Sequence, residues 1–124
     1  MVPIRMDFSY NFQPRQIVCL EHQATHLYAE VIQVVQSRRV GWVRPLLLAE
    51  FPLGDSQSQP LIYDLRSSAD LLWSLALFRP ALDTEVMPLL LQLLVSEPPI
   101  DRDPVASSRL HQFIHQVWQT ETKG

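Results

Sequence analysis

The stretch "HLYAEVIQVVQSRRVGWVRPLLLAE" (26–50) decides the fold, because β-branched and aromatic residues crowd both sides of its short polar segment QSRR (36–39). Its first run is apolar at both alternating positions. Leu27, Ala29, Val31, Gln33 and Val35 have one parity, and Tyr28, Glu30, Ile32 and Val34 have the other. Such a strand is covered on two sides or is bent across a small barrel.

The neighbouring segments extend this pattern into a sheet. "QIVCLEH" (16–22) is a further strand, and "QAT" (23–25) is polar and short enough for a hairpin turn, as is QSRR. Gly41 indicates a bulge or a bend. Pro45 cannot donate a ladder hydrogen bond, so the third strand must be an edge there or must turn.

Residues 50–60 have the composition of a loop, and "LIYDL" (61–65) is one more short strand. The sequence therefore predicts a small bent antiparallel sheet or an SH3-like barrel over about residues 15–65.

After Arg66 the apolar period becomes helical, and three helices are expected, at about 68–78, 84–96 and 104–119. Their expected caps are Ser68, then Asp83 or Thr84, and finally Asp103. The last helix has the clearest signature, with Pro104 at its first position. Its apolar stripe, which we expect to lie in the chain's own core, consists of Leu110, Phe113, Ile114, Val117 and Trp118.

Together these patterns predict an α+β fold. We expect a single domain over residues 1–124, with a β-rich half (1–66) and a helical half (67–124).

Composition excludes several classes of protein. The chain has 124 residues, 47% of them hydrophobic, and a formal net charge of −3, which argues against a general nucleic-acid binder. The N-terminal residues lack the apolar core of a signal peptide, and the longest apolar runs are too short to span a bilayer. A single cysteine cannot form an intrachain disulfide. We therefore expect a soluble, cytoplasmic protein with no membrane span.

The segment "CLEHQATH" (19–26) holds the only cysteine and two of the four histidines. Cys19, His22 and His26 have spacings that a zinc site can use, and His111 and His115 lie one helical turn apart on the last helix. The alternative is a hairpin turn in which Cys19 is a buried strand residue. The second interpretation is favoured, since no second cysteine completes the ligand set, and no metal or cofactor is predicted.

Catalytic patterns are weak. Cys19 with a nearby histidine is a conceivable nucleophile pair, yet a mid-strand cysteine has no evident means of forming a thiolate. With three glycines in the chain, there is no phosphate-binding loop. The pair Asp64 and Asp70 stands beside an expected helix start, where carboxylates usually act as caps. We predict that the protein is not an enzyme and has no catalytic residues.

Surface recognition is the remaining possibility. "SRRVGWVRP" (37–45) gathers three arginines around a tryptophan, and these two residue types are enriched at interface hot spots. The predicted partner-binding residues are Arg38, Arg39, Trp42 and Arg44. The alternative is that Trp42 is a core residue and the arginines are merely solvated.

The segment "YAEVIQVVQSRRVGWVRPLLL" (28–48) looks like the first hairpin of SH3-like small barrels. With "DLRSSADLLWSLALFRPALDTEVMPLLLQLL" (64–94), the chain resembles small uncharacterised proteins of cyanobacteria and chloroplast-bearing lineages. The resemblance implies an auxiliary role around the photosynthetic apparatus. We expect a non-enzymatic interaction module, an assembly factor or small accessory subunit whose partner is a larger protein or complex. The alternative is a small barrel that binds RNA or single-stranded nucleic acid through Trp42 and the arginines.

Overall fold

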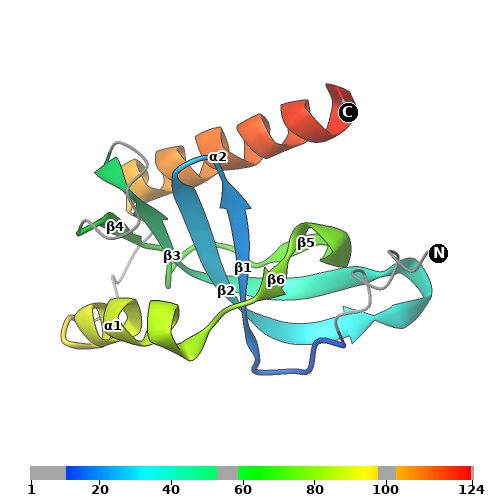
Figure 1. The fold of residues 1–124 in the computed structure, drawn as a ribbon, viewed down its shortest axis with the longest axis horizontal. Helices are drawn as coiled ribbons and strands as arrows, with labels where there is room; N and C mark the ends of the chain where they lie inside the picture. Colours follow the sequence, from blue (N-terminus) through cyan, green and yellow to red (C-terminus); the bar gives the residue numbers. More distant parts are fainter. Residues whose placement is uncertain (1–10, 53–58, 98–102, 124) are drawn as a thin grey trace.

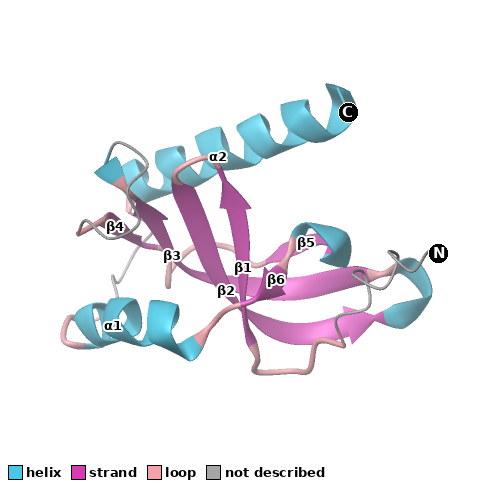
Figure 2. Ribbon diagram, in the orientation of Figure 1, coloured by secondary structure: helices cyan, strands magenta, loops and turns pink. Residues whose placement is uncertain are grey.

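The structure is a computed structural model, and it describes residues 11–52, 59–97 and 103–123. Figures 1 and 2 show the arrangement of its strands and helices. In chain order the elements are β1 (Ile17–His22), β2 (Thr25–Val35), the 3₁₀ turn η2 (Gln36–Arg38), β3 (Val40–Glu50), β4 (Leu61–Asp64), β5 (Leu71–Ser74), the 3₁₀ turn η4 (Leu75–Leu77), β6 (Arg79–Pro80), α1 (Asp83–Leu94) and α2 (Pro104–Lys123).

The antiparallel pair of β2 and β3 is the centre of a six-stranded sheet. Its connection ends on Arg39, which has a left-handed φ of 54°, and the turn between β1 and β2 uses Gln23 at φ 56°. Both hairpins predicted from the polar segments at 23–25 and 36–39 are confirmed. β1 pairs along the other edge of β2.

The outer edge of β3 is divided between two strands. Residues Val40–Val43 pair with β5, and Leu47–Glu50 pair with β4. Pro45 lies between the two paired stretches, beside a register shift in the β2–β3 ladder that leaves Leu46 without an opposite residue. The missing N–H of Pro45 therefore falls in the short stretch of β3 between its two edge partners, which confirms the first of the two expectations, that the third strand is an edge at this residue.

A short segment of the chain links the outer edge of β3 with the outer edge of β1. β5 pairs with β3, the chain passes through η4, and β6 then pairs with β1. Gly41 makes room for this link instead of forming a bulge, because a Cβ there would lie 2.6 Å from Leu75 Cδ2.

The helix predicted at about 68–78 is wrong: this segment forms β5 and η4, and the described residues contain two α-helices rather than three. Leu71 and Trp73 pack against the core while Leu72 is 70% exposed, which is the period of a strand. The alanines and leucines here favour a helix locally. Pairing with the open edge of β3 overrides that preference.

The two helices lie on opposite faces of the sheet (Figure 1). On the α2 side, the core includes Val18, Leu20, Leu27, Ala29, Val31, Val43, Leu48, Phe78, Ala106, Leu110, Phe113 and Val117. On the α1 side, it consists of Cys19, Tyr28, Leu47, Ala49, Val86, Leu89 and Leu93. This double cover confirms the interpretation of β2 as a strand with two apolar faces.

The helix ends differ in how far the sequence predicted them. Asp103 caps α2 as expected, with its Oδ1 accepting the Val105 N–H at 3.0 Å. The expected cap of α1 is wrong: Leu82 is its N-cap, and the carboxylate of Glu85 accepts the Leu82 N–H at 2.8 Å.

The apolar stripe of α2 enters the core through Leu110, Phe113 and Val117, as expected, and Ile114 packs partly against it. Trp118 departs from the prediction, since it is 53% exposed. No helix among the described residues is long and apolar enough to cross a membrane.

We predict that Phe113→Ala lowers the free energy of unfolding by about 3–5 kcal/mol, because it leaves a cavity between α2 and the sheet. Gln112→Ala, on the exposed side of the same helix turn, should change it by less than about 0.5 kcal/mol. Urea denaturation followed by circular dichroism measures both. Equal effects of the two substitutions would show that α2 is not part of the cooperative core.

Candidate functional site

The five candidate ligands of the sequence do not come together. Cys19 and His26 lie close to each other on the α1 side of the sheet. The His22 ring packs edge-on against Phe113, with the ring centroids 6.3 Å apart. His111 and His115 are exposed on α2, where His115 Nε2 lies 3.1 Å from the amide nitrogen of Gln119.

Instead, five polar side chains form a closed circuit of polar contacts, which we call the polar ring: Glu21, His26, Tyr28, Arg79 and Glu85. The Tyr28 hydroxyl donates to Glu85 Oε1 at 2.6 Å. Arg79 donates through Nη1 to Glu85 Oε2 at 2.7 Å, and through Nη2 to Oε1 at 3.0 Å. Arg79 Nε donates to Glu21 Oε1 at 3.0 Å. His26 closes the ring, with Nε2 3.3 Å from Glu21 Oε2 and Nδ1 3.2 Å from the Tyr28 hydroxyl.

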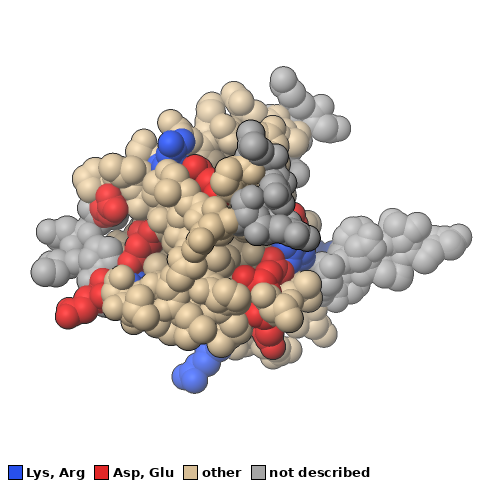
Figure 3. Space-filling view, turned by 60° about the vertical axis from the view of Figure 1, so that its left-hand side comes forward, with Lys and Arg blue, Asp and Glu red and all other residues tan. Residues whose placement is uncertain are grey.

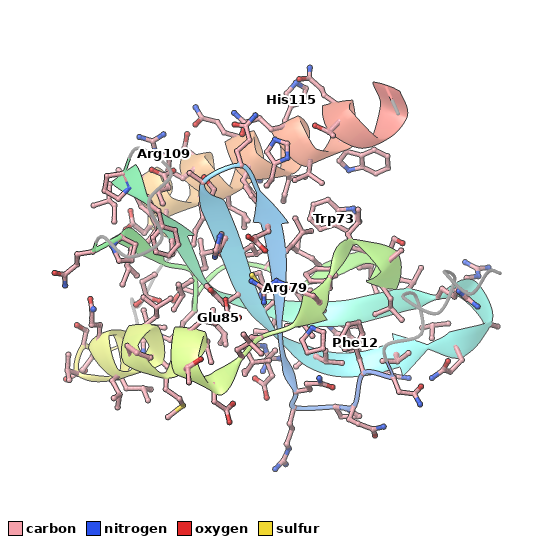
Figure 4. All side chains as sticks on the ribbon, in the orientation of Figure 1. Phe12, Trp73, Arg79, Glu85, Arg109 and His115 are labelled. Carbon is pink, nitrogen blue, oxygen red and sulfur yellow. The ribbon has the colours of Figure 1, made fainter. Side chains whose placement is uncertain are left out.

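Strand register brings these residues together. Glu21 on β1 lies opposite His26 on β2, and Tyr28 follows two residues later on the same strand face. Arg79 on β6 lies opposite Cys19. Glu85 enters from the first turn of α1, and Figure 4 shows Arg79 and Glu85 close together beside the central strands.

The ring strongly perturbs its ionisable groups. Burial alone would raise the pKa of Glu85, but the hydrogen bonds from Arg79, Tyr28 and the Leu82 N–H outweigh it and lower that pKa to about 2. Burial, and then the hydrogen bond to Glu85, raises the pKa of Tyr28. Burial lowers the pKa of His26, against the opposite effect of Glu21. Glu85 is therefore a permanent carboxylate at neutral pH.

A cleft of about 670 Å³ opens beside the ring, between the β1–β2 turn, Phe51 and the start of α1. The polar-ring side chains that line it already bind one another, and no buried side-chain nitrogen or oxygen of the described residues lacks a hydrogen-bond partner. Burial raises the pKa of the Cys19 thiol to about 12, so this sulfur is protonated and enclosed. The arrangement fixes α1 to the sheet and offers no activated nucleophile.

Metal binding requires a separate test, because ligand atoms of Cys19, His26 and Glu85 lie within 4.8 Å of one another. Glu85 was not among the candidate metal ligands predicted from the sequence, because it is 66 residues from Cys19 and no local motif links the two residues. A metal ion here would have to take Glu85 from Arg79 and from the Leu82 N–H, and would have to ionise the Cys19 thiol. The donor set does not fit a resident metal ion.

The second candidate is a surface on the same sheet face, beyond the part that α1 covers. Trp42 lies directly opposite Leu72 on β5, and Val35 lies opposite Val40 on the neighbouring pair of β2 and β3. Trp42 is 38% exposed, and Val35 and Leu72 are exposed as well. We call Val35, Trp42, Arg44 and Leu72 the β-face patch.

Asp70 organises this patch. Its Oδ2 accepts the indole N–H of Trp42 at 2.8 Å, and its Oδ1 accepts from Arg44 Nε at 3.2 Å. Asp70 thus holds an indole instead of capping a helix. Of the predicted partner-binding residues, the structure brings Trp42 and Arg44 together, while Arg38 and Arg39 are exposed in the turn at the end of the same hairpin.

No protein-family model matches the chain, and neither a curated protein sequence nor a solved structure matches it. Function must therefore be argued from the two sites themselves.

The polar ring makes stability depend on pH. Glu85 has a pKa of about 2 when folded against 4.5 when unfolded, so its contribution is complete above pH 4.5 and is lost as the pH falls toward 2. The lowered pKa of His26 adds an earlier loss that begins below pH 6.5. Urea denaturation between pH 7 and pH 2.5 should show stability decreasing through both windows.

Glu85→Gln should lower the free energy of unfolding at pH 7 by about 1–3 kcal/mol, since Arg79 and Tyr28 lose a charged acceptor. The deficit relative to the unmodified protein should shrink as the pH approaches 2. Glu97→Gln is the matched control, because Glu97 is exposed and forms no ion pair with any described residue. A deficit that stays constant with pH would contradict the assigned role of Glu85.

We expect the purified protein to contain no stoichiometric zinc and to unfold identically with and without a chelator. Elemental analysis and thermal melts measure this. One zinc per chain that is lost in His26→Ala would show that the ring residues rearrange around a metal ion.

Proposed function

We propose that the chain is a non-enzymatic protein-interaction module, which acts as an assembly factor or a small accessory subunit of a larger complex. The observation that supports this most directly is the exposed pair Trp42 and Leu72, which lie opposite each other across β3 and β5. Tryptophan and arginine side chains contribute disproportionately to protein interfaces, and this patch places Arg44 beside Trp42.

The patch is also pre-organised. The Asp70 carboxylate fixes both the indole and the guanidinium, and β-sheet pairing fixes the backbone beneath them. A side chain that is already held in one orientation loses little conformational entropy on binding. An exposed tryptophan with these restraints therefore favours a binding surface over a solvated side chain.

The alternative, binding of RNA or single-stranded nucleic acid, is less well supported. The carboxylate of Asp70 lies against Trp42 and neutralises Arg44, where a phosphate backbone would need positive charge. The net charge of the chain, −3, also disfavours nucleic-acid binding. Any nucleic-acid affinity should be weak and should fall steeply with salt.

The resemblance to proteins of cyanobacterial and chloroplast-bearing lineages makes a photosynthetic complex the first partner to test. The proposal includes a cytoplasmic location, which the single, unpaired and buried Cys19 supports.

The test is an affinity capture with the tagged full chain, with quantitative mass spectrometry of the bound proteins and a binding titration with the purified partner. Leu72→Glu should weaken that binding by about 1–3 kcal/mol, which is roughly 5- to 150-fold, by placing a charge in the apolar contact. Leu61→Glu, at the exposed first position of β4, is the matched control and should have no effect.

Arg38→Glu combined with Arg39→Glu tests whether the hairpin turn belongs to the same surface. If it does, the double variant keeps its melting temperature and loses affinity by a similar factor. A well-folded Leu72→Glu variant that binds the partner normally would remove the β-face patch from the proposal.

A further inference from the structure

Helix α1 carries an apolar surface that the fold does not use. Val86, Leu89 and Leu93 face the sheet and are buried. On the opposite side a second stripe runs at i, i+4, i+7 and i+8 through Met87, Leu91, Leu94 and Val95, with exposed fractions between 48% and 85%. We call these four residues the outer stripe. It shares no residue with the β-face patch.

Such a helix is unusual at a protein surface. A surface helix normally alternates an apolar face with a charged one, whereas a helix that is apolar all round is buried in its working state. Between Met87 and Val95 the exposed positions of α1 contain one polar side chain, Gln92, and no charged one. The outer stripe therefore has the character of an interface that lacks its second half.

The charges at the ends of the stripe restrict what can cover it. Asp83 precedes it and Glu97 follows it, and residues 82–97 contain no lysine or arginine. Both acids are exposed, and neither forms an ion pair with any described residue. Arg66 and Arg79, which contact the two ends of α1, are paired with Asp64 and Glu85 respectively. In Figure 3, which turns the left-hand side of Figure 1 forward, acidic groups and a few basic groups are scattered over a largely uncharged surface.

This charge pattern disfavours a second copy of the chain. Parallel pairing of two α1 helices would set Asp83 beside Asp83 of the second copy, and antiparallel pairing would set Asp83 beside Glu97. Either arrangement places like charges at the rim of an apolar contact, which opposes association.

We infer that the outer stripe of α1 docks an amphipathic helix of a protein partner whose apolar stripe is flanked at both ends by lysine or arginine. The twelve residues of α1 extend about 18 Å, so a helix of similar length places its basic ends near Asp83 and Glu97. The leucines provide the contact area, and the two acids select the partner by charge.

The test uses two synthetic 18-residue helical peptides with the same leucine stripe at i, i+3, i+4 and i+7. One peptide has two lysines at each end, and the other has two glutamates at each end. Titration into the full chain, followed by amide chemical shifts and fluorescence anisotropy, should give at least tenfold tighter binding of the lysine peptide. That preference should shrink as salt is raised.

Leu91→Glu should reduce the affinity for the lysine peptide at least tenfold. If this variant has a lowered melting temperature, Leu94→Gln on the same face repeats the measurement. Leu72→Glu should leave peptide binding unchanged, which separates this surface from the β-face patch.

Three results would overturn the inference. They are failure of the lysine peptide to bind, equal affinity for the two peptides, and unchanged binding by a well-folded Leu91→Glu variant. Dimerisation of the unmodified chain in sedimentation experiments, abolished by Leu91→Glu, would instead assign the stripe to a second copy.

Discussion

The long antiparallel pair of β2 and β3 positions every other element of the fold. Each strand has eleven residues, and every other strand of the sheet attaches to this pair or to a strand attached to it. β3 is long enough to hold β5 and β4 in succession on one edge, with Pro45 between them. The 3₁₀ turn η2 connects this pair, and η4 with the short strand β6 carries the chain from the edge of β3 to the edge of β1.

Burial of this sheet on both faces explains why the polar ring lies beside the cleft, where an active site would be expected. Burying the Tyr28 face against α1 also removes the Tyr28 hydroxyl and the His26 ring from water, and each then requires a partner. Glu85 accepts the Tyr28 hydroxyl, and the His26 ring contacts that hydroxyl and Glu21. Arg79 then binds both carboxylates and completes the circuit. Residues of the types that bind metals gather here because buried polar groups need hydrogen-bond partners. The His26 ring is already in contact with Tyr28 and Glu21, and the buried Cys19 thiol stays protonated.

Two exposed surfaces outside the polar ring carry large apolar side chains. Beyond α1 the sheet exposes Trp42 and Leu72, and α1 itself exposes Leu91 and its neighbours. The two proposals together describe a protein that contacts two partners, or one partner over a large area. Asp70 orients the Trp42 and Arg44 side chains of the first surface. The negative charges of Asp83 and Glu97 restrict which partners can bind the second surface.

Features that depend on neighbouring residues could be predicted from the amino-acid sequence alone. The alternation in residues 26–35 predicted a strand buried on both faces, the polar segments at 23–25 and 36–39 predicted the hairpins, and Asp103 with Pro104 predicted the start of α2. Only the tertiary structure decided the rest. Residues 71–77 read locally as a helix, yet the open edge of β3, some thirty residues earlier in the chain, made them a strand and a 3₁₀ turn. Likewise, Glu85 meets Tyr28 across 57 residues, and Asp70 meets Trp42 across 28. Contacts over such separations depend on strand register and helix placement, which local periodicity does not encode.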